Sequence, residues 1–466
     1  MTPKKTLPDL KEYRDYVSTL FSTDPVSDHK QSIGLELELL PLKNSDKQTP
    51  TPVAITGEAE NGTLDLLKKT AETTSELVFS PREDGTPQFA SSSGGNITFE
   101  PGGQVEYSSS ACFSPEEAIS ETVKHVDIVS NSFRDEMILM FHGGMNPWHT
   151  ISEVGLKMQK SRYLEMDRYF QDLGPYGQEM MRLTLSLQIN LDFANQDTGK
   201  QRWIASNLLA PIMCAIFGNS PFAHHHRTDF KSYRSFIWQN MDHCRTGFPS
   251  PEKLLPSDND SVDRYFAYAL DAYVIKLHHD ALQHGEKDSL ISFREWLASD
   301  HPRLHPDIAA WKNHVNLLFP EVRPKGFIEF RTLDGPSRSW WTVPVMLLTA
   351  ILYDHSALKQ VITLLSPQSD SLGKMLRKAS EAGVSAFPDL VKKVFRIGLN
   401  SDYTLFTPEL RDHCERFYTN LTNRDRNPAD DLLDSNDGKI LTPIQFQDHE
   451  QRSMDILAPP GFTIFT

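Results

Sequence analysis

Strict alternation of apolar and polar residues is the clearest pattern in the chain, and it covers residues 182–193 (RLTLSLQINLDF). Leucine, isoleucine and phenylalanine occupy the odd positions, whereas polar residues occupy the even ones. A helix does not show a period of two over such a length, so the pattern predicts a long strand with one core face. The polar face carries Gln188 and Asn190 rather than lysine and glutamate, which favours a lined cavity over a solvated surface.

Three further segments alternate in the same way: IGLELELL at 33–40, NITFEPGGQVEYS at 96–108 and FIEFRTLD at 327–334. The second contains Pro-Gly-Gly, in which proline presets one turn dihedral and glycine permits the others, so it predicts a hairpin. Successive side chains of a strand point to opposite faces. The polar faces of these segments therefore carry five glutamates and one arginine: Glu36, Glu38, Glu100, Glu106, Glu329 and Arg331.

Acidic residues on one strand face are usually solvated, and that interpretation suits each segment taken alone. The five glutamates, however, have no lysine interleaved on their faces. If the strands share a sheet, the carboxylates repel one another unless divalent cations lie among them. Oxygen ligands favour Mg²⁺ or Mn²⁺ over zinc. Glu329 beside Arg331 is compatible either with a metal and a phosphate held together or with a simple ion pair.

Helical periodicity dominates the rest of the chain, so the sequence predicts an α+β protein. Ser114, Pro115 and Glu117 form the start signal of a helix that we expect to reach about Met140. Residues 80–95 are rich in serine, glycine and proline and predict a loop. Further helices are expected at 7–21, 61–69, 161–170, 176–181, 200–217, 263–276, 292–298, 308–318 and 340–365, and through most of the chain after 366.

Composition is that of an ordinary globular protein, with 466 residues of which 39% are hydrophobic and 23% charged. The net charge of -15 argues against non-specific binding to nucleic acid or to an anionic membrane. The longest apolar run, 343–353, is too short to span a bilayer, and the N-terminus has no apolar signal-peptide core. The four cysteines lack a CxxC pattern, so we expect a reducing, cytoplasmic setting without zinc or a disulfide framework.

Residues 232–247 (SYRSFIWQNMDHCRTG) combine Arg234 and Arg245 with Tyr233 and Trp238. Arginines beside aromatic residues suit recognition of carboxylate or phosphate groups, although plain surface ion pairs use the same residue types. The sequence contains neither a P-loop nor a Rossmann glycine motif. A nucleotide would therefore have to bind in another way.

Magnesium ions beside an arginine are a common means of binding ATP and moving its γ-phosphoryl group. A substrate carboxylate would attack that phosphorus, and an amine would then attack the resulting acyl phosphate. This chemistry needs no Ser–His or Cys–His pair, and none is evident in the sequence. The pattern therefore favours an ATP-dependent ligase.

Several segments resemble the glutamate–cysteine ligase family, in particular its plant and bacterial branch, which includes the ligase of ergothioneine synthesis. The most specific combination is EPGGQVE at 100–106 with MMRLTLSLQINLDF at 180–193. The matching segments, in the family's order, are IGLELELL (33–40), ITFEPGGQVEYS (97–108), SRYLEMDRYFQDLGPYGQEMMRLTLSLQINLDF (161–193), FGNSPF (217–222), SYRSFIWQNMDHCRTG (232–247), NHVNLLFPEVRPKGFIEFRTLDGPS (313–337) and ILYD (351–354).

The resemblance implies a glutamine-synthetase-like antiparallel sheet, curved into a funnel and surrounded by helices. It implies a single catalytic domain over 1–466, with a family-like core at 31–354 and a mostly helical C-terminal region at 366–466. The implied reaction joins L-glutamate to L-cysteine with ATP, through γ-glutamyl phosphate, in glutathione or ergothioneine biosynthesis. Small-molecule substrates are the implied partners, without nucleic acid or membrane.

The resemblance also implies roles for single residues. Mg²⁺, or Mn²⁺ in its place, would be coordinated by Glu36, Glu38, Glu100, Glu106 and Glu329. The predicted catalytic residues are Glu329 and Arg331, the latter through contact with the transferring phosphate. The residues expected to bind substrate or nucleotide are Gln188 and Asn190, which would line the metal and substrate region, and Arg234 and Arg245, which are candidates for a carboxylate or phosphate.

The chain departs from the family in two places. It has RTLDGP where the plant enzymes have RGADGG, and VRPKGF where VRLK is more usual. Both lie near the expected mouth of the funnel, so a ligase of the same fold with another amine is an alternative. A catalytically degenerate nucleotide-binding protein is a second, and a glycoside hydrolase, which needs only a pair of carboxylates, is a third. The redox cysteines of the plant enzymes cannot be placed in this sequence, so disulfide regulation is not among our predictions.

Overall fold

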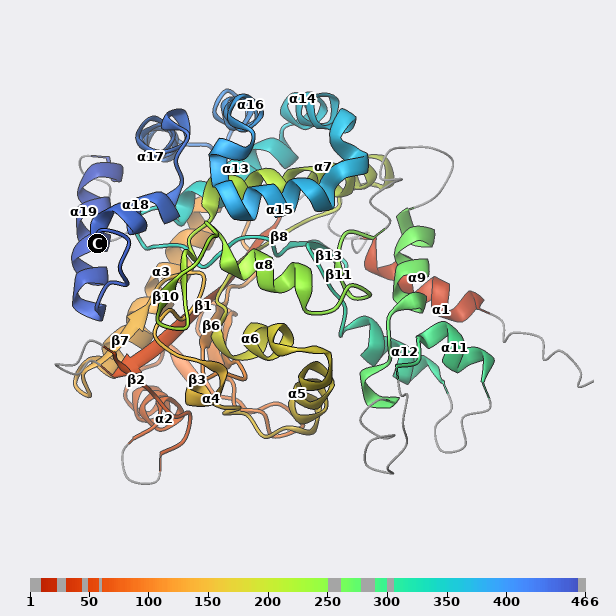
Figure 1. The fold of residues 1–466 in the computed structure, drawn as a ribbon, viewed down its shortest axis with the longest axis horizontal. Helices are drawn as coiled ribbons and strands as arrows, with labels where there is room; N and C mark the ends of the chain where they lie inside the picture. The colour runs from red at the N-terminus through yellow and green to blue at the C-terminus, as the bar shows by residue number, and fades with distance from the viewer. Residues whose placement is uncertain are drawn as a thin grey trace, which may run out of the picture.

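The computed structural model describes residues 10–22, 31–43, 49–57, 61–249, 261–277, 290–299 and 306–459. The strands of its large sheet are β1 (Ile33–Lys43), β2 (Thr51–Pro52), β3 (Leu77–Phe79), β4 (Phe89–Ser91), β5 (Asn96–Phe99), β6 (Val105–Ser108), β7 (Ile138–Phe141), β8 (Leu187–Leu191), β13 (Val322–Pro324) and β14 (Ile328–Phe330). The sheet runs β13–β14–β8–β1–β6–β5–β4–β3, while β2 and β7 pair with the C-terminal half of β1. Its pairings are antiparallel, and helices surround it (Figure 1), so the predicted α+β class is confirmed.

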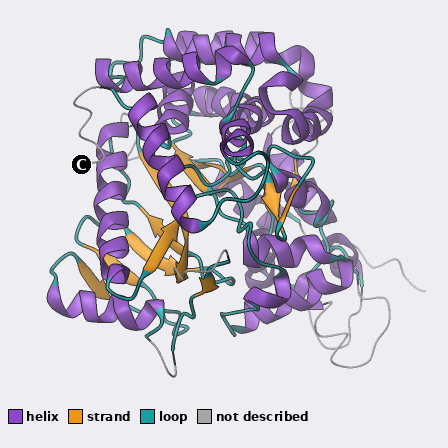
Figure 2. Cartoon of the chain, turned by 60° about the vertical axis from the view of Figure 1, so that its left-hand side comes forward, coloured by secondary structure: helices purple, strands orange, loops and turns teal. Residues whose placement is uncertain are grey.

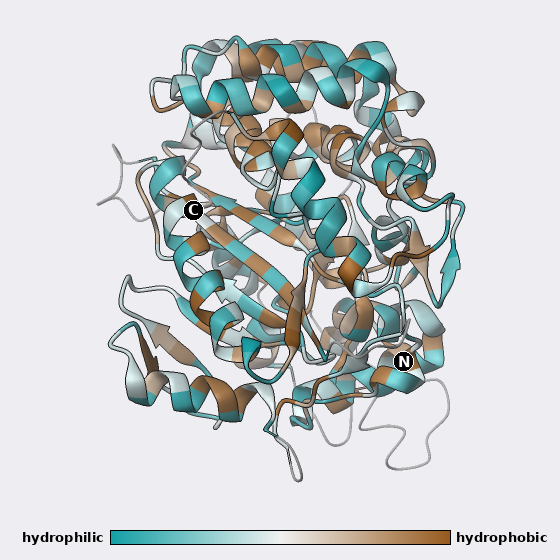
Figure 3. Ribbon diagram, turned by 90° about the vertical axis from the view of Figure 1, so that its left-hand side faces the viewer, coloured by the Kyte–Doolittle hydropathy of each residue, from teal (hydrophilic) through white to brown (hydrophobic). Residues whose placement is uncertain are grey.

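The two faces of the sheet differ in polarity, as the alternating sequence predicts. Leu35 and Leu37 of β1, Ile189 of β8 and Phe330 of β14 are buried in the main hydrophobic core. Figure 3 shows brown and teal residues alternating along the central strands. Burying one apolar face fixes the register, because a slip of one residue would turn every side chain to the other face. The polar side chains are thereby held together on the opposite face.

Helices cover both sides of the sheet (Figure 2). On the apolar side, α13 (Thr342–Tyr353) is buried along its whole length, as expected for a helix that is hydrophobic all round. The helices packed around it include α7 (Gln196–Phe217), α14 (His355–Leu365), α16 (Pro388–Leu399) and α17 (Pro408–Asn420), with α15 (Leu372–Ala382) against α7. The other α-helices among the described residues are α1 (Lys11–Leu20), α2 (Thr63–Thr73), α3 (Pro115–Arg134), α4 (Ile151–Val154), α5 (Ser161–Leu173), α6 (Pro175–Leu183), α8 (Tyr233–Asn240), α9 (Ser261–Asp271), α11 (Phe293–Ala298), α12 (Ile308–Val315), α18 (Pro428–Ser435) and α19 (Pro443–Leu457).

The long strand predicted at 182–193 is shorter than expected. Its first two residues end helix α6, and the strand β8 contains only Leu187–Leu191. Arg182 forms an ion pair with Asp167 of α5, which holds this end of α6 in place. Alternation alone could not reveal that tertiary contact.

Three other boundaries differ from the predictions. The helix expected to reach Met140 ends at Arg134, and β7 follows because it adds to the edge of β1. The helix expected at 340–365 is divided at Asp354, whose extended backbone and side chain cap α14. Strand β4 lies within the predicted loop 80–95, where it pairs with β3 and β5 and buries its own residue Phe89.

The chain after residue 366 is helical, as expected, and helices α15 to α19 account for most of it. No helix among the described residues is long and apolar enough to cross a bilayer. The single catalytic domain over 1–466 stays a prediction.

Candidate active site

A cavity lies on the polar face of the sheet, and we call it the sheet cavity. It contains about 1480 Å³ of space between atoms, part of it open to solvent. Strands β1, β5, β6 and β8 form one side, and helices α5, α6 and α8 supply residues on the other sides. The predicted site residues that line it are Glu36, Glu38, Glu100, Glu106, Gln188, Arg234 and Arg331.

Strand register decides which polar side chains meet in the sheet cavity. Glu38 of β1 lies directly opposite Glu106 of β6, and Glu36 of β1 lies opposite Gln188 of β8. Thr98 of β5 continues the row and donates a hydrogen bond to Glu106 over 3.1 Å. Neighbouring strands lie about 4.8 Å apart, so carboxylates on adjacent strands are within reach of each other's charge.

Burial and mutual repulsion favour the protonated form of these carboxyl groups. Burial, with the nearby charges of Glu38 and Glu36, raises the pKa of Glu100 to about 8. Burial and the charges of Glu36, Glu100 and Glu38 raise the pKa of Glu106 well above its usual value. Burial also raises the pKa of Glu38, although Arg234 acts in the opposite direction. Ionising the whole cluster therefore places like charges side by side, and a cation bound among the carboxylates would offset that repulsion.

Six cationic residues share the lining with these carboxylates: Arg82, Arg162, Arg234, Arg323, Lys325 and Arg331. The guanidinium carbons of Arg234 and Arg331 lie 5.2 and 5.3 Å from the ring centroid of Trp238. Arg331 donates to the Gln188 side-chain oxygen over 2.6 Å, which fixes its orientation. The buried Nε atoms of Arg234 and Arg331 have no hydrogen-bond partner within the described residues. Both guanidinium groups line the cavity and carry positive charge that can attract an anion.

The side chain of Arg234 is held in place by backbone carbonyl oxygens of Arg331 and Thr332. Its Nη1 and Nη2 atoms donate to the carbonyl oxygens of Thr332 and Arg331 over 3.3 and 3.0 Å. The carboxylate of Asp334 accepts hydrogen bonds of 2.7 Å from the hydroxyls of Ser220 and Ser232. Ser232 caps α8, the helix that carries Arg234. This network fixes the positions of the two arginines relative to each other.

Glu329 lies outside the cavity lining. Its position does not agree with the role of metal ligand that we expected from the sequence. It is fully buried in β14, opposite Arg323 of β13. Its oxygens accept hydrogen bonds from Arg323 over 2.5 and 3.0 Å, and from Lys325 and Arg331 over 2.9 Å. Burial alone would raise its pKa, but Arg323, Arg331 and Lys325 hold that pKa well below the usual range. Glu329 therefore orients cations that line the cavity, and its own oxygens are already occupied.

Asn190 also supports the site from outside the lining. Its side-chain nitrogen donates to Glu36 over 2.9 Å, and it lies opposite Glu329 in the sheet. Asn190 thus contacts a carboxylate of the cavity lining, and its place beside a metal and substrate stays a prediction. Asn190 orients one of the carboxylates that line the cavity.

The structure does not bring Arg245 to the sheet cavity, contrary to its expected role in binding a carboxylate or phosphate. The side chain is fully buried and pairs with Asp242, with 2.6 Å between Nε and the carboxylate oxygen. Its other nitrogens donate to the carbonyl oxygens of Leu317 and Tyr273 over 2.7 and 2.5 Å. These partners belong to the protein interior, so Arg245 holds loops together behind the site.

Four cationic residues of the lining were not anticipated from the sequence. The position of Arg323 could have been predicted from the sequence. Lys325-Gly326 marks a turn, and a short hairpin around that turn places Arg323 opposite Glu329. Lys325 follows from the same turn. Arg82 in a predicted loop and Arg162 at the start of a predicted helix carried no local signal.

The carboxylates of the cavity fit a divalent cation by their chemistry, although not as a complete cage. Within the described residues, no group of three or more histidine, cysteine, aspartate or glutamate side chains is arranged to hold a metal ion. The carboxylates that face the cavity nevertheless offer only oxygen ligands and repel one another. Mg²⁺ is usually held by one or two carboxylates together with phosphate oxygens and water. The residues present fit that mode of binding.

Comparison with known proteins gives a family match over most of the chain. The family model described as glutamate-cysteine ligase family 2 (GCS2) matches residues 32–386. The chain is 32% identical over 296 residues to glutamate–cysteine ligase A, chloroplastic, of Oryza sativa subsp. japonica, covering 61% of this chain and 57% of that protein. It is 32% identical over 291 residues to the chloroplastic glutamate–cysteine ligase of Arabidopsis thaliana, covering 60% of this chain and 53% of that protein. The match thus spans little more than half the length of these curated relatives.

One solved structure shares the fold across nearly the whole chain. It is the crystal structure of glutamate–cysteine ligase from Francisella tularensis in complex with AMP, which has a TM-score of 0.50 and 13% sequence identity. The alignment covers 93% of this chain and 91% of that chain. At this identity the likeness concerns the fold alone, and it agrees with the fold expected from the sequence.

Proposed function

Because the chain belongs to glutamate-cysteine ligase family 2, we propose that it is an ATP-dependent ligase that joins L-glutamate to L-cysteine. The products would be γ-glutamylcysteine, ADP and phosphate. The observation that carries this proposal is the sheet cavity, in which four glutamates and six cationic side chains face the same space. A pair of carboxylates would suffice for a glycoside hydrolase, whereas this concentration of arginine suits phosphate groups.

The cationic side of the cavity supports binding of the ATP phosphates. The guanidinium groups of Arg234 and Arg331 are held by neighbouring groups and each keeps a buried donor without a partner among the described residues. Fixed donors aimed at a transferring phosphoryl group stabilise charge that develops on its oxygens, without reorganisation during the reaction. We therefore assign Arg331 to the phosphoryl group that is transferred and Arg234 to a neighbouring phosphate or carboxylate.

The first step transfers the γ-phosphoryl group of ATP to glutamate. A γ-carboxylate oxygen of glutamate attacks the γ-phosphorus, the bond from that phosphorus to the bridging oxygen breaks, and ADP leaves. Arg331, oriented by Gln188 and Glu329, neutralises the negative charge on the moving group. The protein supplies position and charge here rather than a covalent nucleophile.

The second step replaces the phosphate by an amine. The nitrogen of cysteine attacks the carbonyl carbon of γ-glutamyl phosphate, loses a proton, and the C–O bond to phosphate breaks. The departing phosphate takes up this proton, so no carboxylate assigned to the metal ion has to act as the base. The amide and inorganic phosphate then leave.

Magnesium fits the carboxylate side of the cavity. Glu36, Glu38, Glu100 and Glu106 would hold Mg²⁺, or Mn²⁺ in its place, together with phosphate oxygens of the nucleotide. When bound, the ion neutralises phosphate charge and orients the phosphoryl group. Asn190 and Thr98 orient two of these carboxylates through their hydrogen bonds to Glu36 and Glu106.

The setting that we propose is cytoplasmic, and the product would enter thiol biosynthesis of the glutathione or ergothioneine type. The free state of all four cysteines supports a reducing compartment. Three of them, Cys112, Cys214 and Cys414, are buried. The proposed partners are the small-molecule substrates.

The test is ADP release by the purified chain with MgATP and L-glutamate, across a panel of amines led by L-cysteine and L-2-aminobutyrate. We expect cysteine-dependent ADP release and γ-glutamylcysteine as the product, identified by mass spectrometry. Release with a different amine would keep the phosphoryl chemistry and reassign the acceptor. Binding of MgATP without ADP release for any amine would indicate a degenerate ligase, and absence of MgATP binding would overturn the proposal.

A matched pair of variants distinguishes a role of Arg331 in the reaction from a general effect of replacing arginine by lysine. Arg331→Lys keeps the positive charge but removes the guanidinium group that donates hydrogen bonds to Gln188 and Glu329. We therefore expect kcat to fall about 10³-fold. Arg416→Lys makes the same change on an exposed face of α17 and should leave kcat unchanged. Equal activity of the two variants would remove Arg331 from the proposed mechanism.

A further inference from the structure

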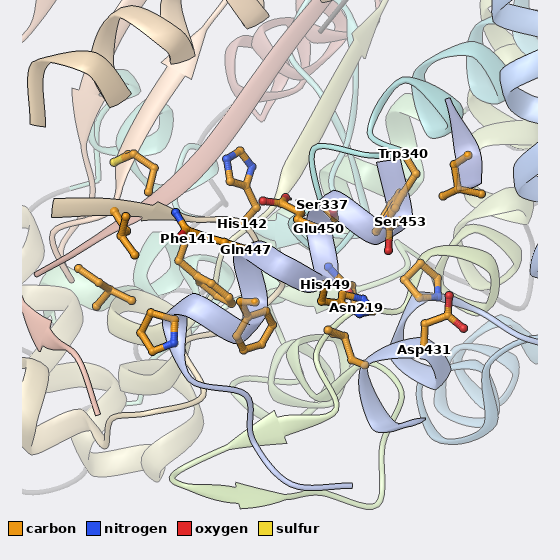
Figure 4. Close-up of a pocket in the computed structure, with 18 of the residues that line it drawn as sticks. Phe141, His142, Asn219, Ser337, Trp340, Asp431, Gln447, His449, Glu450 and Ser453 are labelled. Atoms are coloured by element: carbon orange, nitrogen blue, oxygen red, sulfur yellow. Dashed lines mark hydrogen bonds between the residues drawn. The ribbon is translucent and has the colours of Figure 1, made fainter. Parts of the chain in front are cut away.

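A second cavity lies beneath helix α19, at the end of the sheet where β7 pairs with β1, and we call it the α19 cavity (Figure 4). It contains about 690 Å³ of space between atoms, part of it open to solvent. Within the described part of the chain, it shares no lining residue with the sheet cavity. Residues 421–457, which lie beyond the family match at 32–386, form one wall, and β7 and the segment around Trp148 form another.

The lining of the α19 cavity is apolar and aromatic with a few hydrogen-bonding groups. Phe141, Trp148, Trp340 and Phe446 contribute aromatic rings, and leucine and proline side chains contribute further apolar surface. None of the lining residues in the described part of the chain is lysine or arginine. Among the described residues, the charged groups that line it are the carboxylates of Glu450 and Asp431. Its charge is thus opposite to that of the phosphate-binding side of the sheet cavity.

His142 supplies a buried polar atom without a partner. Its Nδ1 atom is buried and has no hydrogen-bond partner among the described residues. Burial lowers the pKa of the imidazole, while the nearby charges of Glu450, Arg338 and Asp127 act in opposing directions. The ring is therefore neutral near pH 7, and a buried neutral nitrogen without a partner is costly unless a ligand or water meets it. Figure 4 shows His142 and Glu450 on the same part of the wall.

Glu450 is fixed in position and keeps one oxygen for a ligand. Its Oε1 atom accepts hydrogen bonds from the hydroxyl of Ser337 over 3.1 Å and from the backbone N–H of Arg338 over 2.7 Å. Its Oε2 atom has no hydrogen-bond partner within the described residues. A carboxylate held by one oxygen beside an apolar cavity is preorganised to bind a cation or an N–H donor with the other.

From these observations we infer that the α19 cavity is a binding site for a small organic cation, an amine or amidine attached to an aromatic or branched aliphatic body. The carboxylate of Glu450 binds the cationic group, and His142 accepts or donates a further hydrogen bond. The aromatic side chains contact the apolar body and favour a cation nearby. The same charge excludes nucleotides and carboxylate substrates, so this site is separate from the proposed reaction and does not depend on it.

The experiment compares two probes that share a phenyl ring and differ in charge: phenethylamine, which is cationic at pH 7, and 3-phenylpropionate, which is anionic. Each is titrated into the full chain by isothermal titration calorimetry. We expect phenethylamine to bind at least about tenfold more tightly than 3-phenylpropionate. Equal affinities, or no binding of phenethylamine, would overturn the assignment, because apolar contact alone would not distinguish the probes.

Two variants locate the bound amine. Glu450→Gln keeps the acceptor oxygen that Ser337 and Arg338 contact, but it removes the charge, so phenethylamine should bind at least about tenfold more weakly. Asp448→Asn removes one charge from an exposed position of the same helix and should leave binding unchanged. Glu100→Gln in the sheet cavity should also leave it unchanged. A loss of binding only in Glu100→Gln would place the amine in the other cavity and overturn the inference.

Discussion

Glu38 of β1 and Glu106 of β6 are direct cross-strand partners, so two carboxylates lie next to each other on the wall of the sheet cavity. Burial raises the pKa of both groups, and repulsion from neighbouring carboxylates adds to the shift of Glu106. Like charges placed opposite each other destabilise a sheet. The protein retains this unfavourable pair at the site to which we assign magnesium and phosphoryl transfer.

Glu106→Gln should stabilise the protein and inactivate it. The substitution keeps an acceptor for Thr98 and removes one charge from the cluster. We expect the melting temperature without divalent cations to rise by roughly 1–3 °C, and ADP release to fall at least about 10²-fold. Differential scanning fluorimetry and the ADP assay measure the two effects. Glu72→Gln, on an exposed position of α2, is the control and should change neither.

Glu329→Gln should impair the protein in a way that magnesium does not rescue. The change leaves Arg323, Lys325 and Arg331 without the carboxylate that they share. Removing one partner of a buried ion pair typically costs about 3–5 kcal/mol of the free energy of unfolding. We expect a destabilised protein with reduced kcat at every magnesium concentration. Recovery of full activity at high Mg²⁺ would show that Glu329 is a metal ligand after all.

Arg245→Gln should affect folding rather than substrate binding. The substitution leaves Asp242 buried without its cation, so the free energy of unfolding should fall by about 3–5 kcal/mol. Chemical denaturation measures that loss. The KM values for ATP and glutamate, measured on the folded fraction at low temperature, should match those of the unchanged chain. A stable variant with a raised KM for ATP or glutamate would show that Arg245 does take part in substrate binding.

Glu321→Gln should make stability less dependent on pH. Glu321 is buried, and its Oε1 atom has no hydrogen-bond partner among the described residues. Burial raises its pKa from 4.5 to about 7, so its contribution to stability is complete below 4.5 and is lost as the pH rises through 7. The shift corresponds to a loss on the order of 3 kcal/mol.

Urea denaturation of both proteins between pH 4.5 and 8.5 tests this expectation. The variant should gain stability relative to the unchanged chain as the pH increases, because glutamine has no proton to lose. A constant difference between the two proteins across this range would mean that the Glu321 carboxyl group titrates normally.

Much of the sheet could be predicted because alternation is a local property. Glu36 and Glu38 share a face of β1 whatever the strand pairs with, and the same holds for Gln188 and Asn190 of β8. The family-like segments added the expectation that these faces meet. The limits of elements were less predictable, since the end of α6 depends on an ion pair with another helix.

The chemical role of an individual residue was harder to predict than the strand face that its side chain occupies. Glu329 and Glu106 occupy equivalent positions in alternating segments, yet one is surrounded by three cations and the other by carboxylates. Arg234 and Arg245 lie in the same short segment, yet only Arg234 lines the cavity. Burial and partners from distant segments decide these differences, and neither can be read from local sequence.

The sequence by itself determined which side chains face the same way along each strand, because the period of two follows from backbone geometry. It also determined the family, because the specific segments occur in the family's order. Only the tertiary structure decided that Glu38 meets Glu106, that Arg323 and Lys325 occupy the carboxylate of Glu329, and that α19 closes a second cavity. Those outcomes depend on strand register and helix docking, which result from burying the apolar face of the whole chain at once.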